Sequence, residues 1–187
     1  MQAPPDLRRF ESTILVHLDA AYNLARWMTC DAAAADDVVQ DACIRALRFF
    51  DTLVGPSPKA WFMAIVRNAC IDWLRVSARR ESATEYDEDT HGASERGFGD
   101  GAGGASPHAT PESLAMRASD ARWVHAAIAA LPMEFREAIV LRELEELSYK
   151  EISAIVNVPI GTVMSRISRG RDLLARQLGA DVKRARP

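Results

Sequence analysis

Apolar residues recur every three or four positions along most of this chain, which is the spacing of one buried face of an α-helix. Residues 7–80 contain three such stripes, and the breaker Gly-Pro-Ser-Pro at 55–58 precedes the third. The stripes comprise Ile14, Leu18, Ala21, Ala25 and Met28; Ala35, Val39, Ala42, Ala46 and Phe49; and Phe62, Val66, Ala69 and Trp73. No alternating strand pattern occurs, so we expect an all-α protein with a three-helix domain over 7–80, its second helix beginning near Asp31.

A second helical domain is predicted over residues 116–180. Its first helix is expected from about Ala118 to Ala130, and another follows Leu-Pro-Met at 131–133. The stripe of that next helix comprises Phe135, Ala138 and Ile139, with Arg142 at its far end. Two further short helices joined by a tight turn are predicted in residues 147–171.

The spacing of residues 147–171 is typical of a helix-turn-helix, whose second helix lies in the DNA major groove. Ser148 stands three residues before Glu151, as in a capping box. Asn157 suits the turn because it tolerates left-handed backbone, and Pro159 suits the first helical position. The expected buried residues are Ile152, Ile155 and Val156 in the first helix, and Ile160, Val163, Ile167 and Leu174 in the second.

The second helix of this motif carries its polar residues largely on one face: Thr162, Ser165, Arg166 and Arg169. Arginine can bond guanine bidentately and hydroxyls can contact bases or phosphates, while Gly161 leaves room for close backbone approach. The alternative is an amphipathic helical hairpin with a solvated basic face. The capping box, the turn residue, the proline and the polar face together favour a DNA-binding helix-turn-helix over this alternative.

Residues 81–115 are predicted to form a flexible linker, because six glycines and an acidic run cannot bury enough apolar area to fold. The segment holds eight acids against Arg96 alone, a formal charge of −7, which leaves +4 for the rest of a chain of net charge −3. A linker of this length has an end-to-end distance of roughly 30–35 Å, about one turn of duplex DNA. The two domains could therefore contact separate DNA segments at once.

Several classes of protein have no positive support in the sequence. No run of about 18 apolar residues predicts a transmembrane helix, and residues 1–13 lack the apolar region of a secretory signal, so we expect a cytoplasmic protein. Cys30, Cys43 and Cys70 show no metal-site spacing and are expected to be buried structural thiols. The sequence contains no phosphate loop, nucleophile elbow or pair of catalytic carboxylates. We therefore expect no enzyme activity, no cofactor and no metal site.

Taken in order, three blocks resemble the extracytoplasmic-function (group IV) sigma factors of bacterial RNA polymerase. They are DDVVQDACIRALRFF at 36–50, AWFMAIVRNACIDWLR at 60–75, and LPMEFREAIVLRELEELSYKEISAIVNVPIGTVMSRISRGRDLL at 131–174. The blocks cover both predicted domains. The resemblance implies that residues 7–80 form a region 2-like domain and that residues 116–180 form a region 4-like domain.

The family implies that the second helix of the first domain docks on the clamp helices of the polymerase β′ subunit. The positions that match this motif are Asp37, Gln40, Asp41 and Arg45. Short acids and an amide on one helix face can pair with arginines of a partner helix. Without the resemblance, a solvated helix face explains the same residues.

The third helix resembles the part that recognises and melts the downstream promoter element. A polar stripe runs through Asn68, Asp72, Arg75 and Arg79, continued by Arg80; of these, Asn68, Arg75, Arg79 and Arg80 would follow phosphates. The loop 51–59 would form part of a pocket for a flipped base, whose unstacking the pocket must offset. Trp61 is equally a stacking platform or a packing residue, whereas Trp27, Trp73 and Trp123 are expected to pack.

The second domain resembles the reader of the upstream promoter element. Thr162, Ser165, Arg166 and Arg169 would face the groove, and Tyr149 and Lys150 would hold phosphates. The acidic linker would follow a channel of the polymerase by mimicking RNA, or would serve only as a soluble tether.

The sequence therefore predicts a sigma factor that binds the polymerase core through its β′ and β subunits, recognises two promoter elements and helps to melt DNA. The family also implies an anti-sigma factor as a partner. One rival hypothesis is a free-standing regulator, which explains the second domain but not the acidic face of the first. The other is an all-α adaptor with an incidental basic face.

Overall fold

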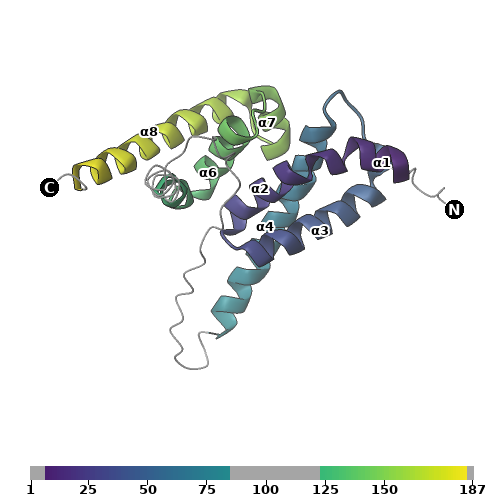
Figure 1. The fold of residues 1–187 in the computed structure, drawn as a ribbon, viewed down its shortest axis with the longest axis horizontal. Coiled ribbons are helices and arrows are strands. Elements are labelled where there is room, and N and C mark those ends of the chain that lie inside the picture. The colour runs from purple at the N-terminus through teal and green to yellow at the C-terminus, as the bar shows by residue number, and fades with distance from the viewer. Residues whose placement is uncertain (1–6, 85–122, 185–187) are drawn as a thin grey trace, which may run out of the picture.

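The computed structural model describes residues 7–84 and 123–184, all of whose regular elements are helical. In the N-terminal domain these are α1 (Leu7–Thr13), the short 3₁₀-helix η1 (Leu15–His17), α2 (Leu18–Thr29), α3 (Ala32–Arg48), the 3₁₀-helix η2 (Phe50–Thr52) and α4 (Pro58–Thr84). In the C-terminal domain a helix over 123–129 precedes α6 (Met133–Ile139), the π-helix η3 (Val140–Leu144), α7 (Tyr149–Val156) and α8 (Ile160–Arg184) (Figure 1). The prediction of an all-α fold is confirmed.

Local signals set the boundaries of the N-terminal helices. Cys30 ends α2 in the left-handed conformation at φ 56°. Asp31 caps α3, because its extended backbone lets a carboxylate oxygen accept from the N–H of Ala34 at 3.1 Å. Helix α4 follows the turn at Gly55, whose φ of +116° is the reason a glycine is required there.

The core of the N-terminal domain differs from the predicted stripe in the second helix. Val38 is buried and Val39 is only half-buried, while Phe50 is buried and Phe49 is 56% exposed. Phe50 turns inward because the chain leaves α3 for η2, and its ring packs edge-on against Phe10 with centroids 5.3 Å apart. The predicted stripe was therefore wrong at Phe49, whereas Val39 is partly buried and packs against the core.

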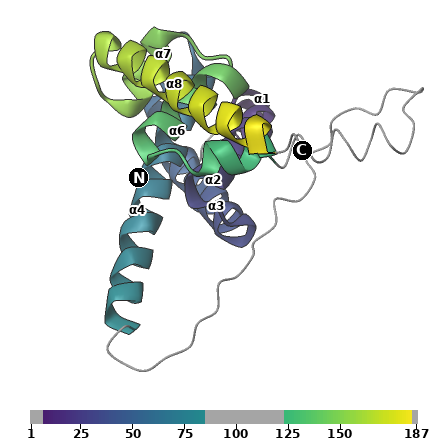
Figure 2. The same ribbon diagram turned by 90° about the vertical axis from the view of Figure 1, so that its left-hand side faces the viewer.

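Helix α4 continues to Thr84, so residues 81–84 are helical although the sequence predicts a linker from residue 81. The far end of α4 extends away from the other helices (Figure 2). The remaining predicted linker, and residues 118–122 of the next predicted helix, lie outside the described residues.

The C-terminal domain is held together by α8, which crosses α6 at Gly170. A Cβ added at Gly170 would lie 2.8 Å from Cγ1 of Ile139, so the close approach requires glycine. Helix α6 continues directly into the π-helix η3, which the sequence did not predict. The N–H of Glu145 closes that segment on the carbonyl of Val140 at 3.1 Å.

The helix-turn-helix is formed by α7 and α8. The predicted capping box between Ser148 and Glu151 is present, and Asn157 adopts the left-handed conformation at φ 53°. Pro159 directly precedes α8 rather than opening it. Ile160 was predicted to be buried but is 44% exposed, because it lies in the first turn of α8, ahead of the contact that buries Val163 and Ile167.

The two domains pack against each other rather than standing apart. Helix α2 contacts α6, and α4 contacts α7 (Figures 1 and 2). Across this contact the rings of Trp27 and His125 stack, with centroids 4.7 Å apart. Arg136 of α6 donates to the carbonyl of Trp27 at 3.1 Å and to the Sγ of Cys30 at 3.0 Å. The buried side chains of both domains form one continuous cluster.

Candidate nucleic-acid and polymerase interface

Three of the four residues predicted to bind the polymerase core line a groove between α3 and α4. Asp37, Asp41 and Arg45 contribute from α3, and the groove has a volume of about 410 Å³. Gln40 is exposed on the same helix but does not line the groove. Its apolar lining residues are Val38, Ala69, Trp73 and Val76, and Arg80 also lines it. We call the three lining acids, Asp37, Asp41 and Asp72, the acidic rim. Acids beside apolar side chains are complementary to a basic amphipathic helix.

Arg45 already forms two ion pairs within this groove. Its guanidinium pairs with Asp41 at 2.7 Å and with Asp72 at 2.9 Å, and its pKa is raised, first by Asp72. Asp72 was predicted on the polar stripe of α4, though not among the residues expected to follow phosphates, and its carboxylate faces α3. Arg45 therefore orients the two acids, and Asp37 and Gln40 are the better-placed groups for a partner.

The predicted phosphate stripe on α4 divides between two sides of the helix. Asn68, Arg75, Arg79 and Arg80 are all exposed. Arg80 lines the groove with α3, whereas Arg75 lines a cleft that α4 forms with the C-terminal domain. The structure thus leaves four polar groups at the surface but does not place them in a single row.

The loop 51–59, predicted to form part of a base pocket, faces the helix-turn-helix on one side and is otherwise largely exposed. A pocket of about 530 Å³ is lined on one side by this loop and the half-buried Trp61, and on the other by Lys150 and Glu151 of α7. Val54 at the loop tip is 87% exposed. The Ser57 hydroxyl donates to Oε1 of Glu151 at 2.7 Å, which ties the loop to α7.

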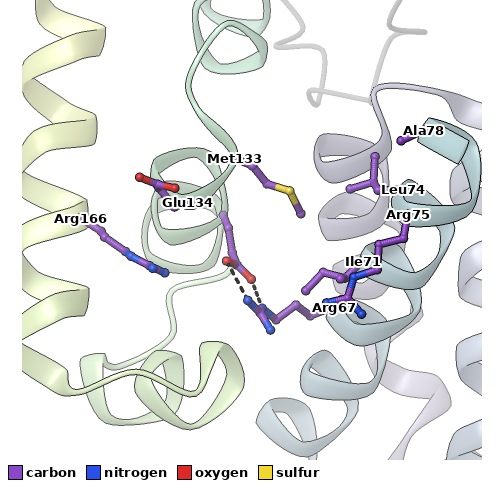
Figure 3. Close-up of a pocket in the computed structure, with 9 residues that line it drawn as sticks. Arg67, Ile71, Leu74, Arg75, Ala78, Met133, Glu134 and Arg166 are labelled. Atoms are coloured by element: carbon purple, nitrogen blue, oxygen red, sulfur yellow. Dashed lines mark hydrogen bonds and ion pairs between the residues drawn. The ribbon is translucent and has the colours of Figure 1, made fainter. Parts of the chain in front are cut away.

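The recognition helix α8 presents part of its predicted reading face to solvent. Ser165 and Arg169 are exposed, while Thr162 and Arg166 are half-buried. Arg166 lines the same cleft as Arg75, and Figure 3 shows both side chains there, on the opposing α8 and α4. At the start of α7, Lys150 is exposed, but the ring of Tyr149 lies under the guanidinium of Arg142 at 4.9 Å. Tyr149 is consequently less available to DNA than its position in the sequence predicts.

Polar contacts between the domains were not predicted from the sequence. Arg67 of α4 pairs with Glu137 of α6 through two hydrogen bonds (Figure 3). The Nζ of Lys59 lies 3.1 Å from Oε2 of Glu145 and donates to its carbonyl at 2.8 Å. The partners are 70 and 86 positions apart. No periodic pattern in the sequence could have connected them.

The structure corrects the prediction that all three cysteines are buried. Cys70 is fully buried, and burial raises the pKa of its thiol to about 12, whereas Cys30 and Cys43 are half-buried. Among the described residues, no group of His, Cys, Asp and Glu is arranged to hold a metal ion. No helix within 7–84 or 123–184 is long and apolar enough to cross a membrane.

Glu151 gives this interface a pH dependence. Its pKa is lowered from the ordinary 4.5, first by the hydrogen bond from Ser57 and then by those from Ser148. A group whose pKa is depressed in the folded state contributes stability above its unfolded pKa, and this contribution is lost as the pH falls through the folded pKa. The charged form of Glu151 therefore stabilises both the cap of α7 and the hydrogen bond from Ser57 in the other domain.

We therefore expect Glu151→Gln to lower the thermal unfolding midpoint at pH 7 and to have a smaller effect at pH 3. Glutamine can still accept at the cap, but it carries no charge to lose. Melting curves followed by circular dichroism at both pH values measure the difference. Glu146→Gln, at an exposed position, is the control. An equal decrease at pH 3 and pH 7 would contradict the assignment.

Two regions of the sigma-70 family match the two domains. Sigma-70 region 2 matches residues 14–80, and region 4 of the same family matches residues 121–174. The second match contains the helix-turn-helix described above.

Among curated proteins, the chain is 35% identical over 149 residues to the ECF RNA polymerase sigma-E factor of Escherichia coli K12, covering 79% of this chain and 75% of that protein. It is 32% identical over 174 residues to the RNA polymerase sigma-H factor of Pseudomonas aeruginosa, covering 92% of this chain and 88% of that protein.

Two solved structures share the fold. The sigma factor RpoE of Bartonella quintana, solved with the anti-sigma factor NepR, has a TM-score of 0.71 at 26% identity and covers 93% of this chain and 99% of its own. CnrH, solved with the cytosolic domain of CnrY, has a TM-score of 0.65 at 25% identity and covers 94% of this chain and 91% of its own. The chain belongs to the extracytoplasmic-function sigma factors, and its function is promoter-specific initiation of transcription by RNA polymerase.

Proposed function

We propose that residues 7–80 form the unit that binds the polymerase core and the downstream promoter element, and that residues 116–180 form the unit that reads the upstream element. The observation that carries this division is the pair of separate polar surfaces. One is the acidic groove between α3 and α4, and the other is the exposed face of α8.

In the first unit, Asp37, Gln40 and Asp41 would contact basic residues of the polymerase β′ clamp helices, and Arg45 would hold Asp41 in place. Asn68, Arg75, Arg79 and Arg80 would follow DNA phosphates along α4. The support for these roles is the exposure of the α4 residues and the fit of the acidic rim to a basic partner helix.

In the second unit, Ser165, Arg166 and Arg169 would reach base edges or phosphates, with Thr162 beside them. Lys150 would hold a phosphate at the start of α7, and Tyr149 would contribute less because it stacks with Arg142. The protein would carry out no covalent chemistry of its own and would act in the cytoplasm with the polymerase. The two solved relatives were determined with anti-sigma factors, which supports a partner of that kind for this chain.

Transcription in vitro tests the proposal. Purified protein is combined with Escherichia coli core polymerase and a library of promoter fragments, and the transcripts are sequenced. We expect transcripts only when both protein and core are present, from fragments that share two separated elements. Binding of a palindromic site by the protein alone, with no transcription, would instead support a free-standing regulator.

Binding to the selected fragments is expected to fall steeply as the salt concentration rises, because each phosphate contact releases counterions. Salt-insensitive binding would favour an all-α adaptor with an incidental basic face.

A further inference from the structure

The first turns of α8 expose two large apolar side chains. Ile160 is 44% exposed and Met164 is 52% exposed, although the same helix buries Val163 and Ile167. Neither is among the side chains that pack against the buried core of the described residues. Residues four positions apart on a helix lie on the same side of it, so these two are neighbours at the surface. We call Ile160 and Met164 the apolar ridge.

The exposed residues of α8 repeat with helical spacing and define the face that the helix presents to solvent. Residues 162–163 and 166–167 are buried or half-buried, whereas the pairs around them are exposed. Over 160–169 the exposed face consists of Ile160, Gly161, Met164, Ser165, Ser168 and Arg169. In a helix-turn-helix, the N-terminal residues of the second helix contact base edges in the major groove. The apolar ridge therefore lies at the end of α8 that would come nearest to the bases.

The residues beside Met164 on this face are small. A Cβ added at Gly161 would meet no atom within 4 Å. The hydroxyl of Ser165 donates to the carbonyl of Thr162 at 2.9 Å, so its proton is already used within the helix. Ser168 is a further short side chain on the same face. Met164 thus extends beyond these neighbours, which leave room for the helix to approach DNA closely.

The major groove offers one apolar group that such a side chain can recognise, which is the C5 methyl of thymine. The other groups at the base edges are hydrogen-bond donors and acceptors. An apolar side chain that covered one of them would leave it without a hydrogen bond, which is unfavourable. Methionine is unbranched and polarisable, so it can adapt its shape to a methyl group. The chemistry of the apolar ridge therefore favours thymine over the other three bases.

We propose that Met164 is a specificity-determining residue, which recognises one thymine of the upstream promoter element through the C5 methyl of that base. Ile160, one turn away, excludes water from the same contact. This inference rests on the proposed function of α8 as the reader of the upstream element. It adds an apolar contact to the polar contacts proposed for that helix, and it makes the contact specific to a single group of the DNA.

Replacement of thymine by 2′-deoxyuridine tests the contact, because it removes the methyl group and keeps every hydrogen-bonding group of the base pair. Holoenzyme made from this protein and Escherichia coli core polymerase is titrated with a selected promoter fragment. The titration is repeated with fragments in which each thymine of the upstream element, on either strand, is replaced singly. We expect one position at which the affinity falls about fourfold, which is the effect of losing one buried methyl group.

Met164→Ala completes the comparison. This variant should bind the thymine fragment at least about fourfold more weakly than the wild type, and it should bind the thymine and deoxyuridine fragments at that position equally. Met164 is exposed, so the helical circular dichroism of the variant should equal that of the wild type. The deoxyuridine series with the wild type requires no variant and decides the matter if Met164→Ala does not fold.

Two further variants serve as controls. Met164→Leu keeps an apolar side chain of similar volume, so it should retain the preference for thymine over deoxyuridine. Val124→Ala shortens an apolar side chain that is 42% exposed on the helix over 123–129, away from α8 in the sequence. Its affinity and its preference for thymine should equal those of the wild type.

The outcomes separate this inference from the proposed function on which it rests. Equal binding of the wild-type holoenzyme to the thymine and deoxyuridine fragments at every position, with normal transcription, would overturn the role of Met164 and leave the sigma function intact. Weaker binding by Met164→Ala that keeps the full deoxyuridine effect would also overturn it, and would indicate that the apolar ridge contacts a protein partner. Absence of transcription by the wild type from every fragment would overturn the domain roles before any thymine is replaced.

Discussion

Replacement of Asp37 and Gln40 together by alanine is expected to weaken binding to core RNA polymerase by about 2 kcal/mol or more, which is about thirty-fold. Both side chains are exposed on α3, and Asp37 belongs to the acidic rim of the groove with α4. Truncating one partner of an interfacial charge pair leaves the other charge unpaired, which is why the expected loss is large. Surface positions of this kind change folding stability little.

The measurement is a titration of labelled protein with core polymerase, with circular dichroism as the test of folding. Asp36→Ala is the matched control, because Asp36 is an exposed acid on the same helix that does not line the groove. An equal loss from Asp36→Ala would point to a diffuse charge effect. Wild-type affinity in the double variant would reject the proposed docking face.

Arg166→Ala and Arg169→Ala are each expected to weaken binding to the upstream promoter element by about 1–3 kcal/mol if the arginine reads a base. Arg169 is exposed on α8, and Arg166 is half-buried at the cleft with α4. A base contact relaxes the sequence preference at one position. A phosphate contact weakens binding to all sequences alike and lowers the salt dependence by about one counterion.

Binding of the holoenzyme to a selected promoter and to single-base variants of its upstream element distinguishes these results. Arg171→Ala is the matched control on the same helix. Arg171 pairs with Glu143 at 2.6 Å and is directed toward η3 rather than toward the proposed DNA face. Promoter binding should be unchanged in that variant. Unchanged binding in both Arg166→Ala and Arg169→Ala would contradict the proposal that α8 lies in the DNA major groove.

Local patterns in the sequence predicted the helices well wherever one residue and its near neighbours decide the outcome. The predicted Ser148–Glu151 capping box and left-handed Asn157 are present, and the helix expected to begin near Asp31 is capped by that residue. These are contacts within three or four residues, so the sequence alone contains both partners. Errors arose at helix ends, such as Phe49 and Ile160, where packing across elements decides which side chain turns inward.

The candidate site was only partly predictable. The acidic face of α3 and the polar face of α8 were found, because residues on one helix face share a period. The pairing of Arg45 with Asp72 was missed, since it joins two helices whose rotation about their axes the sequence does not specify. For the same reason the sequence did not show that Asp72, on the polar stripe of α4, faces α3.

The sequence by itself determined that this chain is all-α and that it carries a helix-turn-helix, because helical periodicity and short-range caps encode these features directly. The order of its three motif blocks added the resemblance to the sigma factors. Only the tertiary structure decided how the two domains meet. Arg67 and Glu137 are 70 positions apart, and each is ordinary in its own helix. Their pairing depends on burial that exists only when the domains pack, because a surface ion pair has little net stability and a buried carboxylate requires its partner.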